Sequence, residues 1–148
     1  MNGSDSDRAG TLTKLTEAEC LEFLSSTSVG HIAFVNAEGQ QLIPVNFMFF
    51  NGFIYFRTAY IGLLSGLTHG HDDVAFGVDH HEDVSHSGWN VTARGGARQV
   101  EDRATISKVL INPNAQPWAG GVRSTVIEVR PKSISGRKVN VRAAEPGR

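Results

Sequence analysis

The sequence predicts a mainly β protein, an antiparallel barrel with a few short helices. Runs of β-branched and aromatic residues recur along the chain and are separated by short turns. Asn51-Gly52 joins two such runs, and this dipeptide is the strongest short signal for a β-hairpin. Helical spacing of apolar residues is confined to brief segments, so alternating βαβ units are not expected.

The expected helices are short, and two of them begin at a side chain that can cap them. Thr16 and Glu19 form a capping box for a helix that ends near Ser26. Asp102 caps a helix that reaches Leu110. A connector helix of one or two turns is expected over residues 61–67.

The expected strands occupy the remaining apolar runs and number about six. The first two should pair across the turn at residues 37–40. Gly95 and Gly96 indicate a bulge or tight bend of the kind that closes small barrels. Prolines and glycines predict a surface loop at residues 111–121. The strands are expected at residues 29–36, 42–50, 53–58, 74–78, 89–100 and 124–129, and residues 133–141 continue the last one in extended form.

Length and net charge limit the possible classes of protein. The 148 residues fit one domain, expected over residues 12–141 between flexible tails at residues 1–11 and 142–148. A formal net charge of −1 argues against binding to nucleic acid. Basic residues outnumber acidic ones by seven to two from residue 121 onward, which is compatible with an anionic small ligand. Without a signal-like start or a long apolar run, no membrane association and a cytoplasmic location are expected.

Common hydrolase, zinc and nucleotide motifs are absent from the sequence. Five histidines lie within eighteen positions beside several carboxylates and would suit zinc if they converged. Their spacing matches no known ligand pattern, so no metal site is predicted and a solvated acidic loop is favoured. Cys20, the only cysteine, is expected to pack in the core. The histidines are His69, His71, His80, His81 and His86.

Three segments carry a resemblance to a known family. In chain order they read IPVNFMFFNGFIYFRT, SGWNVTARGGARQVED and WAGGVRSTVIEVRPKSISGRK. Together, over roughly residues 15–139, they are similar to the pyridoxamine 5'-phosphate oxidase-like flavoproteins, in the actinobacterial, nitroimidazole-resistance-like branch. The resemblance implies an antiparallel split β-barrel that forms a homodimer, with two FMN sites at the interface that are each built from both chains.

The first segment carries matches to cofactor-binding positions. Pro44, Val45 and Asn46 match the strand that passes along the flavin ring in relatives, with backbone groups toward the ring. Arg57 and Thr58 match the pair that holds the FMN phosphate. A guanidinium suits that role, because its planar fork of donors fits phosphate oxygens.

The chain departs from the family pattern after this pair. Relatives continue with a Gly-Ser-Lys-type segment whose Lys adds a second phosphate contact, whereas this chain has Leu63 there. Loss of one cation predicts flavin binding that is roughly tenfold to hundredfold weaker. The cations that could compensate are Arg94, Arg98 and Lys138.

The other two segments carry five further matches. Ser87, Trp89 and Asn90 match a block that supplies donors near the phosphate in relatives. Trp118 and Arg123 match a Trp and an Arg that relatives contribute to the flavin from the partner chain. A cation near the pyrimidine edge would stabilise reduced, anionic flavin. Without the resemblance, Trp89 would be read as barrel filling, Trp118 as a loop anchor and Arg123 as a strand-edge charge.

The sequence therefore predicts an FMN-dependent oxidoreductase with a small-molecule redox substrate. A nitroaromatic, a quinone or a deazaflavin cofactor is a candidate substrate, and no side chain is assigned as a catalytic acid or base. Pyridoxamine phosphate oxidation itself is disfavoured, because the basic C-terminal motif of those enzymes is missing. The alternative is a non-catalytic flavin- or haem-binding module, since a resemblance assigns a pocket better than it assigns a reaction.

Overall fold

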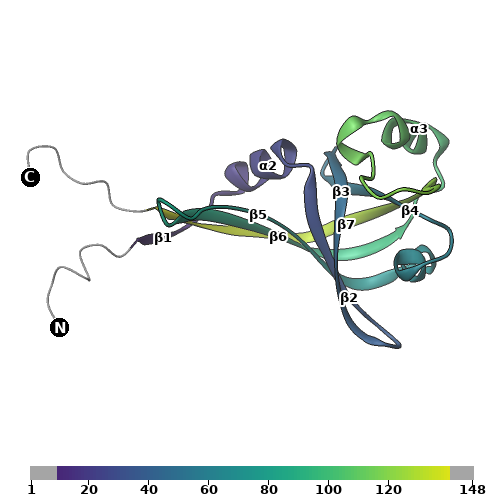
Figure 1. Cartoon of the computed structure of the whole chain (residues 1–148), viewed down its shortest axis with the longest axis horizontal. Helices are drawn as coiled ribbons and strands as arrows, with labels where there is room; N and C mark the ends of the chain where they lie inside the picture. The colour runs from purple at the N-terminus through teal and green to yellow at the C-terminus, as the bar shows by residue number, and fades with distance from the viewer. Residues whose placement is uncertain (1–9, 141–148) are drawn as a thin grey trace, which may run out of the picture.

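A computed structural model describes residues 10–140 of the chain. Within them, seven strands form one sheet in the order β1-β7-β4-β3-β2-β5-β6, and pairing of β6 with β7 closes all but β1 into an antiparallel barrel. Figure 1 shows β5, β6 and β7 continuing beyond the barrel as a long arm, whereas α3 lies at the other end. The strands are β1 (Thr11–Lys14), β2 (Val29–Asn36), β3 (Gly39–Phe50), β4 (Phe53–Thr58), β5 (His71–Glu82), β6 (Ser87–Gln99) and β7 (Thr125–Asn140). The α-helices are α2 (Glu17–Ser26) and α3 (Arg103–Ile111), and the 3-10 helices are η1 (Leu63–His69) and η2 (Pro113–Ala115).

Local signals place the two α-helices where the sequence predicts them. The Thr16 hydroxyl accepts from the backbone N–H of Glu19 at 3.1 Å, and the Thr16 N–H donates to Glu19 Oε1 at 3.0 Å. Asp102 accepts from the backbone N–H of Thr105 at 3.0 Å. These bonds satisfy N–H groups that the first helical turn leaves without a partner, and they define where each helix begins.

The predicted hairpins are also present. Asn51 and Gly52 have φ angles of 56° and 87°, the left-handed pair that a type I′ turn requires between β3 and β4. β2 and β3 pair along the whole of β2 across the expected turn. The register of β6 against β7 shifts between Arg94 and Gly95, so the irregularity predicted at these glycines is present, but the extra residue is Lys132 of β7.

Other elements differ from the prediction, and each difference involves pairing with a distant segment. β5 extends from residue 71 to residue 82, so His71, His80 and His81 lie in a strand instead of an acidic loop. The connector after β4 is a 3-10 helix shifted by two residues, and β7 is one continuous strand. β1, which pairs with the end of β7, was not predicted. The expected tails lie outside the described residues, except for Gly10 and Thr11, and Thr11 begins β1.

Two apolar clusters hold the fold together. Ile54 and Phe56 of β4 point into the barrel, where they pack with side chains such as Phe47 and Phe76. Tyr55, between them, points to the outer face and belongs to the cluster beneath α3. The outer cluster comprises Met48, Tyr55, Val100, Val109, Ala115 and Val126. The odd-numbered positions of β4 therefore face α3 and the loop that follows it.

No helix among residues 10–140 is long and apolar enough to cross a membrane.

Candidate functional site

Four of the predicted site residues meet at the end of β4. The Arg57 Nε donates to the backbone carbonyl of Arg123 at 2.7 Å. The Trp118 backbone N–H donates to Asn46 Oδ1 at 3.0 Å. The loop between η2 and β7 is thereby held against the outer face of β3 and β4. These four residues are called the Arg57 cluster below.

Gln116 also belongs at this cluster, although the sequence did not indicate it. Its Oε1 accepts from Arg57 Nη1 at 3.1 Å. Gln116 lies in the Pro- and Gly-rich loop, where no periodicity relates a side chain to a distant strand. Its proximity to Trp118 in the sequence is the one signal that could have suggested it.

Arg123 is the member of the Arg57 cluster that has a buried donor without an acceptor among the described residues. Its Nε is buried and has no acceptor among residues 10–140, while its Nη2 makes only a long bond of 3.5 Å to the Gly120 carbonyl. An unsatisfied buried donor costs about 1–3 kcal/mol. The loop therefore carries a donor that an oxygen acceptor from a ligand would satisfy after a small rearrangement.

Thr58 does not share a face with Arg57. Its side chain is only 2 % exposed, and its hydroxyl donates to the Ala59 carbonyl at 3.3 Å. Successive strand residues point to opposite faces, so the Thr58 hydroxyl and the Arg57 guanidinium lie on opposite sides of β4. One phosphate could contact both only where the chain bends at the end of the strand. On β3, Val45 packs toward the barrel core, whereas Pro44 is exposed on the side of Asn46.

The second group of predicted residues lies where β6 begins, on the arm. The Trp89 ring stacks on Phe23 of α2 with centroids 4.0 Å apart and planes inclined by 11°. The Ser87 hydroxyl shares a 2.6 Å hydrogen bond with Ser85, and Asn90 is exposed. Trp89 therefore has a structural role within its own chain, while Asn90 remains available to another molecule.

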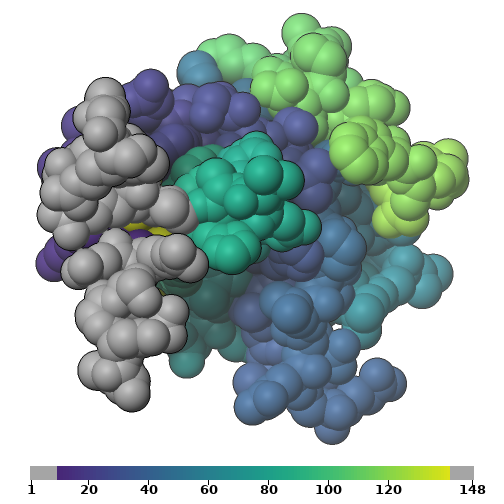
Figure 2. Space-filling view, turned by 60° about the vertical axis from the view of Figure 1, so that its left-hand side comes forward, coloured from purple at the N-terminus to yellow at the C-terminus, as the bar shows by residue number. Residues whose placement is uncertain are grey.

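The two groups are far apart in one chain. On β7, Val126 pairs with Arg57 and Arg137 pairs with Asn90, so eleven residues separate them along the strand. At about 3.3 Å per residue this is roughly 36 Å. In the space-filling view (Figure 2), the tip of the arm comes forward and the loop after α3 lies apart from it on the right. A single chain therefore does not bring together all the predicted site residues.

Leu63, which stands where relatives have a phosphate-binding Lys, lies in η1 and provides no positive charge. Its side chain is 48 % exposed and lines a cavity of about 430 Å³ that Asn36 and Glu38 also border. The suggested replacements are engaged elsewhere, since Arg98 pairs with Glu128 and Lys138 pairs with Glu19 at 3.2 Å. Arg94 borders a groove beside β2 and β5. None of these three cations is bonded to the Arg57 cluster.

Comparison with known proteins decides the family. The model of the family described as pyridoxamine 5'-phosphate oxidase matches residues 16–138. The chain belongs to this family. The resemblance drawn from three segments and the split-barrel class are both confirmed.

Solved structures of family-like proteins agree with the barrel. A proposed pyridoxamine 5'-phosphate oxidase from Corynebacterium glutamicum is 28 % identical with a TM-score of 0.73, over 90 % of this chain and 96 % of that one. An FAD-binding protein from Mycobacterium smegmatis is 29 % identical with a TM-score of 0.66, over 86 % of this chain and 98 % of that one. In sequence, the chain is also similar to an uncharacterized protein from Mycobacterium tuberculosis, which is 24 % identical over 135 residues, 88 % of each chain.

The five histidines of residues 69–86 do not form a metal-binding cluster. His80 pairs with Glu82 at 2.9 Å and His81 with Asp83 at 3.4 Å, both at the exposed tip of the arm. Within residues 10–140, no three His, Cys, Asp or Glu side chains are placed to hold a metal ion. The acidic, histidine-rich segment forms the end of a hairpin.

Cys20 is a core residue, as predicted. It is 1 % exposed within the barrel cluster. Burial, together with the Glu19 and Glu17 carboxylates, raises the pKa of its thiol. A thiol with a raised pKa is a poor nucleophile at neutral pH.

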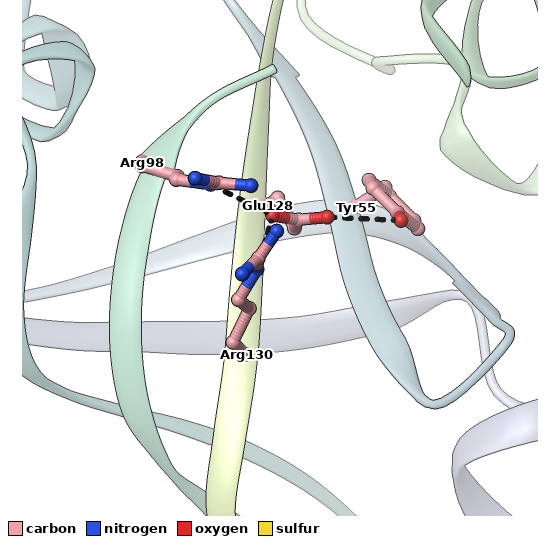
Figure 3. A network of polar contacts seen from close by, with 4 residues as sticks. All are labelled: Tyr55, Arg98, Glu128 and Arg130. Atoms are coloured by element: carbon pink, nitrogen blue, oxygen red, sulfur yellow. Dashed lines mark hydrogen bonds and ion pairs between the residues drawn. The ribbon is translucent and has the colours of Figure 1, made fainter. Parts of the chain in front are cut away.

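A second polar cluster, centred on Glu128, lies on the outer face of β4, β6 and β7 (Figure 3). Glu128 Oε1 accepts from the Tyr55 hydroxyl at 3.1 Å, and its Oε2 accepts from Arg98 Nε at 3.1 Å and Arg130 Nε at 2.8 Å. Burial acts to raise the pKa of Glu128, but the hydrogen bonds from Arg130, Arg98 and Tyr55 outweigh it and hold the pKa below its usual value. Glu128 is therefore a buried carboxylate that stays ionised at neutral pH.

Proposed function

We propose that this protein is an FMN-dependent oxidoreductase whose flavin site forms between two copies of the chain. The observation that carries the proposal is the convergence of Asn46, Arg57, Trp118 and Arg123 at one end of a family barrel. The similarity to an FAD-binding protein at 29 % identity supports a flavin as the ligand class. FMN and FAD share the isoalloxazine ring, ribityl chain and first phosphate, and these are the parts that the Arg57 cluster would contact.

Arg57 is the residue that would hold the phosphate. Its guanidinium now donates to two neutral oxygens, those of Arg123 and Gln116. A phosphate oxygen in their place would form charge-assisted hydrogen bonds, which are about twice as strong as neutral ones. Exchange of these partners would free Gln116 and the Arg123 carbonyl from Arg57, while the bond from the Trp118 N–H to Asn46 would still hold the loop.

The remaining residues of the Arg57 cluster would position the ring. When bound, the flavin supplies the hydride or electron transfer, and the protein supplies orientation and electrostatics. The β3 backbone at Pro44 and Val45 would lie along the ring. Arg123, with its unpaired Nε, would place a positive charge beside the pyrimidine edge.

In relatives the partner chain contributes the counterparts of Trp118 and Arg123, but here both contact Arg57 or Asn46 of their own chain. We therefore infer that the second copy would instead supply Ser87, Trp89 and Asn90. The separation of these residues from Arg57 within one chain supports such a shared site. Large apolar side chains near the end of β4 and on the neighbouring loop are exposed, and exposed apolar patches are typical of protein–protein interfaces. Tyr60, Ile61, Trp118 and Val122 are 76–84 % exposed.

The first experiment is the visible spectrum of the purified protein, followed by titration with FMN and with FAD. We expect a yellow complex with either flavin, and Arg57→Ala should weaken its affinity at least tenfold. Arg103→Ala, an exposed arginine on α3, is the matched control and should bind as the wild type does. Equal affinity of wild type and Arg57→Ala would refute the phosphate role.

A non-catalytic flavin or haem carrier is the second candidate, and the observation in its favour is Leu63. A yellow protein that is inert to reduced nicotinamide and reduced deazaflavin, with nitroaromatic or quinone acceptors, would favour a carrier. Turnover with any such pair would favour the enzyme, and a Soret band would favour haem.

Leu63→Lys tests whether the missing cation limits affinity. The substitution restores the residue type that relatives have at this position, so FMN should bind about tenfold more tightly. Leu63→Met, which keeps the size and lacks the charge, should bind as the wild type does. A Lys variant with unchanged affinity would mean that this position does not face the phosphate.

A further inference from the structure

A cavity of about 620 Å³ lies on the outer face of the barrel, apart from the Arg57 cluster. Its wall is formed by the β3–β4 hairpin, the end of β6 and the segment that leads into α3, the first part of β7, the first turns of α3 and the end of η1. None of the eleven residues predicted for the flavin lines it. Its volume lies in the range of small-molecule sites, roughly 300–1,000 Å³.

Three cations and three carboxylates line this cavity, and two of the cations meet a single carboxylate on its floor. Tyr55, Glu128 and Arg98 are direct neighbours across β4, β7 and β6, and Arg130 lies two residues farther along the same face of β7. One carboxylate thus faces two guanidinium groups, and it binds both of them through Nε. The two arginine side chains are 56 % and 49 % exposed, so their terminal nitrogens remain accessible.

A third cation faces the floor from α3. Lys108 Nζ lies over the Phe50 ring, 4.8 Å from its centroid. Two further carboxylates border the same cavity: Asp102 already accepts from both the backbone N–H and the hydroxyl of Thr105, and Glu101 is exposed and offsets the charge of one cation. The donors without an acceptor in the described chain are therefore the terminal nitrogens of Arg98, Arg130 and Lys108.

Aromatic side chains complete the wall. Phe50 is 41 % exposed, and the Arg130 guanidinium lies 5.3 Å from the centroid of the Phe53 ring. Guanidinium forks bind carboxylate and phosphate groups in a bidentate manner, and exposed rings offer apolar contact to the rest of a ligand. Figure 3 shows the arginines and Tyr55 grouped around Glu128, which fixes the position of these donors.

We propose that this cavity is a second ligand site, which binds a small molecule with a carboxylate or phosphate group and an apolar or aromatic body. The oxyanion pairs with the terminal nitrogens of Arg98 and Arg130, and Lys108 closes over it from α3. Glu128 is the residue that positions the two arginines. The site is independent of the flavin site and does not require it.

The test is a titration followed through the Nε–Hε signals of the arginines in ¹H–¹⁵N spectra, at constant ionic strength set with chloride. The probes are inorganic phosphate, phenyl phosphate and benzoate. We expect the Arg98 and Arg130 signals to shift saturably, with the two aromatic probes binding more tightly than inorganic phosphate. The better of the two aromatic probes identifies the phosphate or the carboxylate class.

Variants separate this site from the flavin site. Arg98→Gln and Lys108→Gln should each weaken phenyl phosphate binding about tenfold, and Lys108→Gln leaves the Glu128 pairs with both arginines intact. Arg57→Ala and Arg103→Gln should leave it unchanged. Absence of saturable shifts, equal affinity in Lys108→Gln, or loss of binding in Arg57→Ala would each overturn the proposal.

Discussion

At the scale of single residues, Glu128 is the side chain on which most polar contacts converge. It is 6 % exposed and uses both carboxylate oxygens to accept from three donors on three strands. A buried carboxylate is tolerated only when it is paired, and here the pairing also orients the guanidinium groups that flank the outer cavity. Stability and the proposed second site therefore depend on the same residue.

Glu128→Gln should lower the free energy of unfolding by about 2 kcal/mol at pH 7, because two arginines lose their anionic partner but can still reach water. Urea denaturation measures this difference. Glu38→Gln, in the exposed turn between β2 and β3, is the control and should change stability by less than about 0.5 kcal/mol. An equal effect of the two substitutions would show that the network does not stabilise the fold.

The pH dependence of this difference follows from the lowered pKa of Glu128. Its ordinary value is 4.5, and the folded state holds it lower. A group with a depressed folded pKa contributes stability above its unfolded pKa and loses that contribution as pH falls through the folded value. The gap between wild type and Glu128→Gln should therefore be constant near neutrality and shrink below pH 4.5.

The Tyr55 hydroxyl should ionise at a higher pH than an exposed tyrosine does. Burial, followed by the nearby charge of Glu128, raises the pKa of Tyr55 to about 12. Because this folded value exceeds the ordinary value of 10.0, the contribution to stability is present below pH 10 and is lost as pH rises through 12. Tyrosinate absorbance should show a component near pH 12 that Tyr55→Phe removes, provided the protein is still folded by circular dichroism. A titration curve that Tyr55→Phe leaves unchanged would contradict the assignment.

At the scale of elements, the barrel closes where Gly95 of β6 lies opposite the bulge at Lys132 of β7. A Cβ on Gly95 would lie 1.9 Å from the Arg130 carbonyl oxygen, whereas a Cβ on Gly96 would meet no atom closer than 3.5 Å. The backbones of β6 and β7 approach each other here because no side chain intervenes.

Gly95→Ala should destabilise the protein by about 3 kcal/mol or prevent folding, since two backbones would have to move apart. Gly96→Ala should cost less than about 1 kcal/mol. Thermal denaturation of the two variants makes the comparison, and similar melting temperatures would mean that the close approach at Gly95 is not needed for closure.

At the scale of the whole molecule, the arm formed by β5, β6 and β7 separates two groups of residues that the family resemblance assigns to one site. The distance of roughly 36 Å along β7 is too large for a mononucleotide to bridge within one chain. The proposed shared site requires a dimer in which the arm of each chain lies beside the Arg57 cluster of the other, an arrangement that a twofold axis allows.

Complementation between variants tests this arrangement. Arg57→Ala alters one half of the site, and Asn90→Asp alters the other by placing a negative charge near the phosphate. If the two chains are refolded together in equal amounts, half of the dimers are mixed and each has one intact site, so FMN binding should return to about a quarter of the wild-type sites. Sedimentation should show a dimer. A mixture that binds no more FMN than the separate variants would contradict a shared site.

How much the sequence could predict depends on the distance over which each residue acts. The capping box at Thr16, the turn at Asn51-Gly52 and the irregularity at Gly95 involve neighbouring residues or one required conformation, and all three were predicted. β1 and the extended β5 are short of apolar residues and are stabilised by pairing with distant strands, so local patterns did not indicate them. For the site, the resemblance selected Arg57 and Asn46, but it did not suggest Gln116, which reaches Arg57 across a loop.

The sequence by itself determined the class of fold, the family, the positions of the helix caps and the hairpin, and the core role of Cys20, because these follow from local conformational preferences and from motifs in fixed order. Only the tertiary structure decided that Arg98, Glu128, Arg130 and Tyr55 form one network, and that Asn90 and Arg57 lie far apart in one chain. The physical reason is strand register. A residue's neighbours across a sheet depend on which distant strands pair and at which offset, and that choice is made by the packing of the whole barrel.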